Sequence, residues 1–224
     1  MNSDLKLLRL LQLASPGLPV GGFTYSQGLE WAVEAGWVKG AEGFRSWQRQ
    51  QIDDTLGYLD WPLLVRLYRA CEADDAMAFA HWSGFLLANR ETAELRTEER
   101  QRGAALARML DGWQLGQAAE WRSSLELTQL GGMAWLAAHW GIPLRDLLLG
   151  HGFSWLEGAV MAGVKLVPFG QQAAQSLLRD LSEDLSAVLE RALALPDEEL
   201  GGGLPLLAIA SARHETQYTR LFRS

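Results

Sequence analysis

The sequence predicts an all-α protein, folded as a single-domain bundle of about ten helices. Three observations lead to this prediction. Apolar residues recur at helical spacing along most of the chain. Stretches in which apolar and polar residues alternate, as strands require, are scarce. Finally, no internal repeat and no long linker divides the 224 residues, so we expect one domain over residues 1–224.

The amino-terminal half contains six of the expected helices. The first covers residues 4–14, where leucines on most sides indicate burial. A loop rich in Pro and Gly follows, and Thr24 or Ser26 is expected to cap a helix that runs to about Val38. The next helices are expected over 44–56, 61–72, a segment capped by Asp74 that runs to 86, and 91–110.

The carboxyl-terminal half continues the helical pattern. Ser123 or Ser124 is expected to begin a helix that runs to Ala137. A short helix over 143–149 and a separate one over 154–164 follow, and the second is expected to be the most buried because it is apolar on nearly all sides. A long helix over 170–193 and a final segment over 204–224 complete the chain.

Composition and charge exclude several classes of function. The hydrophobic fraction of 48% and the charged fraction of 21% are ordinary for a soluble globular protein. A net charge of −7 repels phosphate backbones and anionic lipids, so we expect neither nucleic acid nor membrane as a partner. With one cysteine, no signal peptide and no transmembrane stretch in view, we expect a cytoplasmic protein.

No motif for catalysis, metal binding or nucleotide binding is present, so we expect no enzyme activity, cofactor or metal site. The four histidines lack the spacings at which pairs of ligands share a helix face. Cys71 lies in an apolar helical stripe and is expected to be a packing residue. The alternative is a small-molecule-binding or catalytic helical protein with a pocket built around Trp135, His139, His151 and Trp155.

Three segments admit both a structural and a functional interpretation. The loop over 15–30 is either a rigid connection or a shaped recognition surface. Glu91, Glu94 and Glu98 form an acidic ridge that is either solvated or a docking site for a basic partner. Gln171, Gln172 and Gln175 form either an ordinary exposed helix start or a subunit interface, since amides can be buried without the cost of a charge.

The last segment, residues 211–224, differs from the rest of the chain. Arg213, Arg220 and Arg223 against Glu215 give it a net charge of +2, which leaves −9 for the remainder of a chain whose total is −7. These arginines alternate with Tyr218, Leu221 and Phe222, and arginine and aromatic residues are those that anchor interfaces. The tail is expected either to fold back on its own acidic body or to become ordered on a partner.

Four segments, taken in order, resemble the urease accessory protein UreF family. The most specific are LLQLASPGLPVGGFTYSQGLE over 10–30 and ETQYTRLFRS over 215–224. The stretches over 94–103 and 164–175 are weaker matches, and Phe169 stands where the family pattern leads us to expect Leu. The resemblance extends from about residue 5 to the end of the chain.

The resemblance implies an all-α fold that dimerises and has no enzyme activity of its own. It implies a role in delivering nickel to apo-urease, within a complex that contains the accessory protein UreD, called UreH in some organisms, and the GTPase UreG. It thus makes the chain an adaptor that couples GTP hydrolysis to nickel insertion. In that case residues 211–224 are a carboxyl-terminal docking tail.

The resemblance also suggests roles for individual residues. The expected contacts with UreD are Pro19, Tyr25, Tyr218, Arg220, Phe222 and Arg223. The expected dimer contacts are Gln171, Gln172 and Gln175. The residues expected to face UreG or to couple to it are Glu30, Glu94, Lys165 and Asp180.

Overall fold

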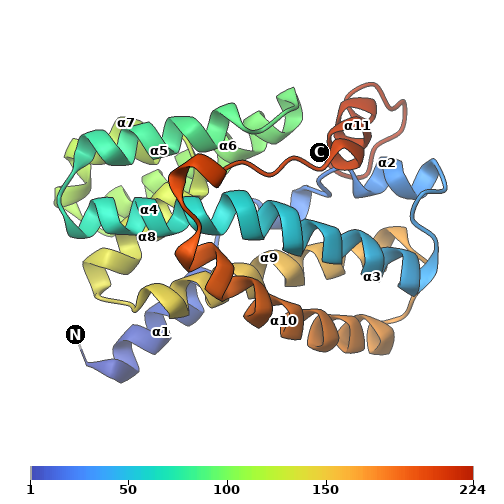
Figure 1. Ribbon diagram of the computed structural model, residues 1–224, viewed down its shortest axis with the longest axis horizontal. Helices are drawn as coiled ribbons and strands as arrows, with labels where there is room; N and C mark the ends of the chain where they lie inside the picture. The colour runs from blue at the N-terminus through green and yellow to red at the C-terminus, as the bar shows by residue number, and fades with distance from the viewer. Residues whose placement is uncertain (1, 224) are drawn as a thin grey trace.

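A computed structural model describes residues 2–223, and within this range the secondary structure is entirely helical, which confirms the predicted fold class (Figure 1). The α-helices are α1 (Ser3–Ala14), α2 (Leu29–Glu34), α3 (Gly40–Gln50), α4 (Trp61–Glu72), α5 (Ala76–Ala88), α6 (Ala93–Gly112), α7 (Arg122–Leu125), α8 (Gln129–Trp140), α9 (Leu144–Leu166), α10 (Gln171–Ala194) and α11 (Pro205–His214). The other helical segments are η1 (Gly22–Thr24), η2 (Gln51–Asp60), η3 (Gly116–Trp121) and η4 (Asp197–Glu199).

The helices form two groups around one hydrophobic core. Helices α4 to α8 form one group at the upper left of the view, and α1, α3 and α10 pack against α9 (Figure 1). Every residue of α8 from Gln129 to Ala137 is buried, because α8 packs against both α4 and α6. The expectation that residues 154–164 are the most buried is therefore wrong, since α9 keeps one side partly open to solvent.

The two helices expected over 143–149 and 154–164 are one continuous helix, α9. Gly150 and Gly152 do not break it, because the neighbouring helices pack directly against their backbone. A Cβ atom at Gly150 would lie 2.7 Å from Leu10 on α1, and one at Gly152 would lie 2.4 Å from the Trp61 ring on α4. Close packing of three helices thus outweighs the low helix propensity of glycine.

The gap expected between residues 56 and 61 is also absent, because the π-helix η2 joins α3 to α4. Pro62 has no N–H to donate to the carbonyl of Tyr58 four residues earlier. That carbonyl instead accepts a hydrogen bond of 3.1 Å from the backbone N–H of Gly201. The wider turn therefore accommodates the proline within one long helical element.

Several helix starts differ from the expected ones. Helix α2 begins after Gly28, whose φ of 79° and close approach to the Ser211 backbone both require glycine. Of the two predicted capping residues, Ser26 does contribute, because its hydroxyl accepts a hydrogen bond of 3.3 Å from the backbone N–H of Glu30 in the first turn. Asp75 rather than Asp74 caps α5 through its side chain. Thr128 caps α8 and divides the segment expected over 123–137 into α7 and α8.

One helix in the described range, α9, is long and apolar enough by length and composition to cross a membrane. The apolar window of α9 is 44% buried inside the protein. The helix packs against α10, α1 and α4, as the core helix of a bundle does. Its apolar character is thus explained by contacts within the chain.

Replacing Gly152 tests the close packing of α9 against α4. We expect Gly152→Ala to lower the free energy of unfolding by about 1–3 kcal/mol, because the added methyl group overlaps the Trp61 ring. Gly158 lies on the same helix with no atom near its Cβ position, so Gly158→Ala should stabilise the protein by about 0.5–1 kcal/mol. Urea unfolding of both variants measures this, and equal effects would contradict the packing.

Candidate functional site

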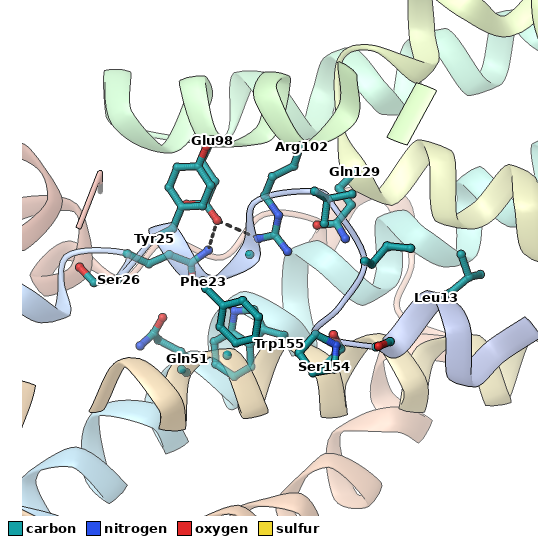
Figure 2. Close-up of a pocket in the computed structure, with 18 of the residues that line it drawn as sticks. Leu13, Phe23, Tyr25, Ser26, Gln51, Glu98, Arg102, Gln129, Ser154 and Trp155 are labelled. Carbon is teal, nitrogen blue, oxygen red and sulfur yellow. Dashed lines mark hydrogen bonds and ion pairs between the residues drawn. The ribbon is translucent and has the colours of Figure 1, made fainter. Parts of the chain in front are cut away.

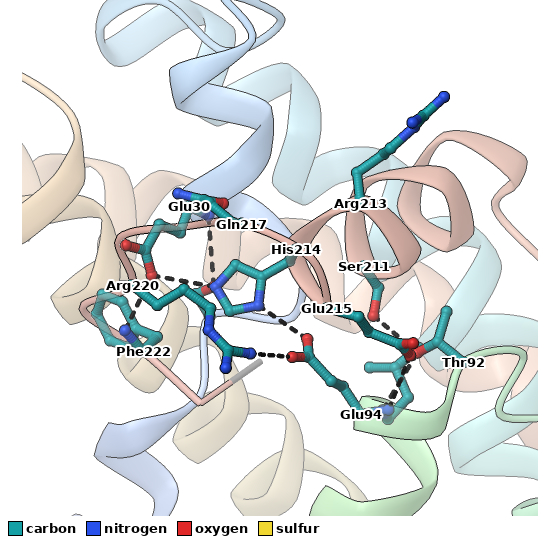
Figure 3. Close-up of polar contacts among 12 residues, drawn as sticks. Glu30, Thr92, Glu94, Ser211, Arg213, His214, Glu215, Gln217, Arg220 and Phe222 are labelled. Atoms are coloured by element: carbon teal, nitrogen blue, oxygen red, sulfur yellow. Dashed lines mark hydrogen bonds and ion pairs between the residues drawn. The ribbon is translucent and has the colours of Figure 1, made fainter.

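The carboxyl-terminal tail is folded onto the body of the protein. After α11 ends at His214, the chain crosses α6 and α2 and returns to the loop that precedes α2 (Figures 1 and 3). The backbone N–H of Arg223 donates a hydrogen bond of 2.7 Å to the carbonyl of Thr24 in that loop. Of the two expectations for the tail, the structure shows the one in which it folds back on its own body. Ser224, the last residue of the expected tail, lies outside the described residues.

The carboxylate of Glu30 is the hydrogen-bond acceptor that holds the end of the tail. Its carboxylate lies in the first turn of α2 and is 8% exposed. It accepts hydrogen bonds of 2.7 Å from the backbone N–H of Leu221 and 2.9 Å from that of Phe222. Nε2 of His214 lies 3.2 Å from the same carboxylate. A buried charge with this number of donors is held at small cost and fixes the path of the backbone.

Glu94 is the second carboxylate of the site. One of its oxygens lies 2.8 Å from Nδ1 of His214, and the other accepts a hydrogen bond of 2.9 Å from Arg220 (Figure 3). His214 is fully buried between Glu94 on α6 and Glu30 on α2. The imidazole thus joins two helices, and Arg220 adds the tail to them.

Two further contacts fix α11 against the start of α6. The hydroxyl groups of Ser211 and Thr92 lie 2.7 Å apart and are both buried. The carboxylate of Glu215 accepts hydrogen bonds from the backbone N–H groups of Ala93 and Glu94, which are unpaired in the first turn of a helix. A negative charge at this end of α6 is also favoured by the helix dipole.

Phe222 anchors the tail in the hydrophobic core. Its side chain is 5% exposed, and the ammonium group of Lys165 on α9 lies 5.3 Å from the ring centroid. Tyr218 is fully exposed, and Leu221 is 64% exposed. The tail therefore has a buried face, which holds it in place, and an outer face that presents an aromatic and an aliphatic side chain. We refer to Glu30, Glu94, His214, Arg220 and Phe222 together as the tail latch.

The acidic ridge predicted from Glu91, Glu94 and Glu98 does not form one face of α6, because Glu91 is exposed ahead of the helix and the other two glutamates contact segments of the chain itself. Glu94 belongs to the tail latch, and Glu98 is 3% exposed. Glu98 accepts hydrogen bonds from Arg102 and from Gln27 of the loop. Glu98 thus forms an i,i+4 ion pair with Arg102, and both Glu94 and Glu98 hold segments of the chain itself.

The loop over 15–28 lies beside the tail and is itself well packed. Tyr25 is 9% exposed, and its hydroxyl donates a hydrogen bond of 2.7 Å to Gln101 on α6. Burial raises the pKa of Tyr25, and the nearby Glu98 carboxylate raises it further. Pro19 is exposed on the same loop. The two predicted contact residues thus differ, since Tyr25 positions the loop and Pro19 faces solvent.

A polar cavity lies behind this loop, between α6 and α9 (Figure 2). Glu98 and Arg102 enter it from α6, and Ser154 and Trp155 from α9. The indole N–H of Trp155 donates a hydrogen bond of 3.2 Å to Gln27. Amides, a hydroxyl and one ion pair therefore surround a small space, an arrangement suited to water or another small polar guest.

A buried cluster of charges adjoins this cavity. Asp60, at the end of η2, lies 2.8 Å from Arg90, which also pairs with Glu99 at 2.6 Å. Burial raises the pKa of Asp60 to about 6, although Arg90 opposes the shift. In the same region the indole N–H of Trp61 donates to Nδ1 of His151, and burial lowers the pKa of His151 to about 3. His151 is thus neutral at physiological pH.

The alternative pocket of two tryptophans and two histidines is not formed. His139 stacks on Trp135 at 5.0 Å and lines an open groove beside Cys71 and Glu120. His151 and Trp155 line the interior cavity instead. These two pairs lie on different helices, α8 and α9, and face different spaces. Burial also raises the pKa of the Cys71 thiol to about 12, which does not suit a nucleophile.

The remaining predicted residues lie away from the tail latch. Gln171, Gln172 and Gln175 are all exposed at the start of α10. Asp180 lies further along α10 and pairs with Arg45 of α3 and with Arg179. The structure thus brings Glu30, Glu94 and Lys165 together around the tail and leaves Asp180 apart from them. Among residues 2–223, no group of three or more His, Cys, Asp or Glu side chains is arranged so that it could hold a metal ion.

Comparison with known proteins identifies the family. The UreF family matches residues 38–182, which is more than half of the chain. A urease accessory protein UreF of Pseudomonas putida strain F1 is 82% identical over 224 residues and covers both chains completely. Similar proteins of the same name from Pseudomonas entomophila strain L48 and Klebsiella pneumoniae strain MGH 78578 are 81% and 57% identical, again over the full length of both chains. The chain belongs to the UreF family.

Members of the UreF family are accessory proteins for urease maturation and have no catalytic role, so the expectations of family and of a non-enzymatic function are confirmed. The tail latch gives this UreF-family chain a defined site. Four of its residues lie in segments on which the resemblance rests: Glu30 in 10–30, Arg220 and Phe222 in 215–224, and Glu94 in a weaker one. Sequence reasoning does not select His214, although it directly precedes Glu215 in the most specific segment.

Acid should destabilise the protein through His151. The folded-state pKa of about 3 lies below the unfolded value of 6.5, so the neutral ring adds stability above pH 6.5 that is lost as the pH falls toward 3. Between pH 6.5 and about 5, this loss is about 2 kcal/mol. His151→Gln keeps an acceptor for Trp61 and removes the titration.

Urea unfolding at the two pH values should therefore show a loss for the wild type that is about 2 kcal/mol larger than for His151→Gln. Asp60 acts in the opposite direction, since its raised pKa adds stability as the pH falls below 6, but it is present in both proteins. Equal losses in the two proteins would contradict a neutral, buried His151.

Proposed function

We propose that this UreF-family chain is a non-catalytic adaptor in the cytoplasm that assembles with UreD (UreH) and the GTPase UreG. In this complex it couples GTP hydrolysis to the insertion of nickel into apo-urease. Nickel is the cargo of the complex, and the chain needs no cofactor. The observation that carries the proposal is the folded tail, which presents exposed side chains from a fixed backbone.

The outer face of the tail and of the adjoining loop is the proposed contact with UreD. Tyr218 has no side-chain contact that would be lost on binding and is fully exposed. Arg223 and Pro19 are also exposed, on two segments that are joined by the backbone hydrogen bond between Arg223 and Thr24. Because the tail latch already orders the backbone, a partner can bind this face with a small loss of conformational entropy.

Arg220, Phe222 and Tyr25 act differently from the residues of the outer face. Arg220 is 41% exposed and pairs with Glu94, whereas Phe222 and Tyr25 are buried. We propose that these three residues support the UreD contact by holding the tail and the loop in place. Their replacement would then weaken binding by freeing the segment rather than by removing a direct contact.

Dimer formation and contact with UreG are assigned to other surfaces. The exposed amides of Gln171, Gln172 and Gln175 can make hydrogen bonds across a two-fold interface without burying charge. For UreG we propose Lys165, which is exposed next to Phe222, and Asp180, whose pairing with Arg45 leaves it half-buried. Glu30 and Glu94 take part indirectly, through the tail latch.

Replacing Tyr218 tests the outer face of the tail. We expect Tyr218→Ala to weaken the complex with UreD by about tenfold or more, because truncating an aromatic hot spot of an interface costs about 2 kcal/mol or more. Its stability should be unchanged, since the side chain makes no internal contact. Size-exclusion chromatography with light scattering, followed by titration calorimetry, measures complex formation and affinity, and urea unfolding measures stability.

Met77 offers a matched control for this experiment. It is 85% exposed and lies on α5, away from the tail (Figure 1). Met77→Ala should form the complex with UreD as the wild type does. If both variants bind like the wild type, the proposed contact is wrong, and if wild-type protein itself fails to bind UreD, the adaptor function is contradicted.

Lys165 tests the coupling to UreG. We expect Lys165→Ala to change the rate of GTP hydrolysis by UreG within the complex, while the free energy of unfolding changes by about 1 kcal/mol at most, the value of an exposed cation–π contact. Lys39 is exposed at the start of α3, and Lys39→Ala should leave the rate unchanged. A GTP hydrolysis rate that Lys165→Ala does not alter would remove this residue from the proposal.

A further inference from the structure

Both ring nitrogens of His214 contact carboxylates, and we propose from this that the tail latch closes fully only when the imidazole carries two protons. Docking of the tail then becomes linked to pH. The last step of this inference, that assembly with UreD is also linked to pH, rests on the function proposed above. The first step concerns the chain alone.

Each ring nitrogen of His214 faces the carboxylate of a different glutamate. Nδ1 of His214 lies 2.8 Å from Glu94, and Nε2 lies 3.2 Å from Glu30. A neutral imidazole has one N–H group and one lone pair, so it can donate to one of the two glutamates only. The doubly protonated ring donates to both.

The other contacts of the two glutamates show that these side chains act as acceptors. The two oxygens of Glu30 accept the backbone N–H groups of Leu221 and Phe222, and the remaining oxygen of Glu94 accepts from Arg220. Neither glutamate therefore needs to donate a proton to the ring. With a neutral His214, one lone pair of the ring would face a carboxylate oxygen at hydrogen-bond distance.

His214 lies between the buried carboxylate of Glu30 and the partly buried carboxylate of Glu94, and the other charged groups nearby have contacts of their own. The tail contributes Arg220, which already pairs with Glu94, and α9 contributes Lys165, which lies over the Phe222 ring. The other acids nearby have partners of their own: Glu34 of α2 bonds to Gln217, Glu215 caps α6, and Glu98 of α6 pairs with Arg102. Arg213, next in the chain, points away from the latch (Figure 3).

Because His214 is buried, its protonation state determines how firmly the tail is held. His214 has no exposed surface, so neither solvent nor salt screens its two contacts. Loss of a proton removes one charge-assisted hydrogen bond and leaves a repulsive contact in its place. The carboxylates involved are those that bind the backbone of Leu221 and the side chain of Arg220. Raising the pH should therefore loosen the tail rather than unfold the bundle.

The test uses the full-length chain and compares about pH 6 with about pH 9, a range that spans the titration of most histidines. Nitrogen NMR of the ring reports the protonation of His214 in the chain alone. Titration calorimetry with UreD at the same two pH values reports docking. We expect an imidazolium at the lower pH, and a UreD affinity that falls by about tenfold or more at the higher pH.

The variant Glu94→Gln distinguishes the effect of the second proton on His214 from the effect of the side-chain contacts around it. The amide group that this substitution introduces can donate to a neutral His214 while its oxygen accepts from Arg220, so the variant should keep the tail docked and lose the pH dependence. His81→Gln is the matched control, because His81 is exposed on α5, and this variant should retain the pH dependence of the wild type.

Two results would overturn the inference: a neutral His214 ring in the docked tail at about pH 6, or an unchanged pH dependence in Glu94→Gln. Complete absence of UreD binding at both pH values would instead contradict the proposed adaptor function. In that case the NMR measurement on the chain alone still decides whether the latch holds a proton.

Discussion

The buried carboxylate of Glu30 is the contact on which the functional part of the structure depends. It receives two backbone N–H groups of the tail and one nitrogen of His214, and it lies in the first turn of α2. Without these donors the charge would be expensive to bury, so the carboxylate and the tail stabilise each other. Through this contact α2, α11 and the tail behave as one unit attached to the bundle.

Polar contacts also organise the interior behind that unit. The π-helix η2 places Asp60 beside Arg90, and Glu98 holds both Arg102 and the loop residue Gln27. These ion pairs favour one arrangement of the helices, since a buried charge left without its partner would cost several kcal/mol. The exposed side chains that we assign to partners are therefore presented by rigid segments, as suits an adaptor.

Local sequence patterns predict the parts of this fold that local interactions determine. Helices such as α4 and α10 follow from apolar periodicity, and the tail stands out by its own charge and aromatic residues. The continuity of α9 does not follow from the sequence, because the fit of Gly152 against Trp61 is a tertiary contact. For the same reason Glu94 resembles part of a surface ridge, because its partners lie about 120 residues away in sequence. The family resemblance draws attention to segments that contain latch residues, but the contacts between these residues are seen only in the structure.

Hydrogen exchange at the backbone of the tail tests the central claim most directly, in the chain alone and without any partner. If Glu30 holds the tail, the amides of Leu221 and Phe222 should exchange at least about a hundredfold more slowly than the same residues in an unstructured peptide. The amide of Tyr218, which lies on the outer face, should exchange faster than both. Exchange of Leu221 and Phe222 at the rate of an unstructured peptide would contradict the account.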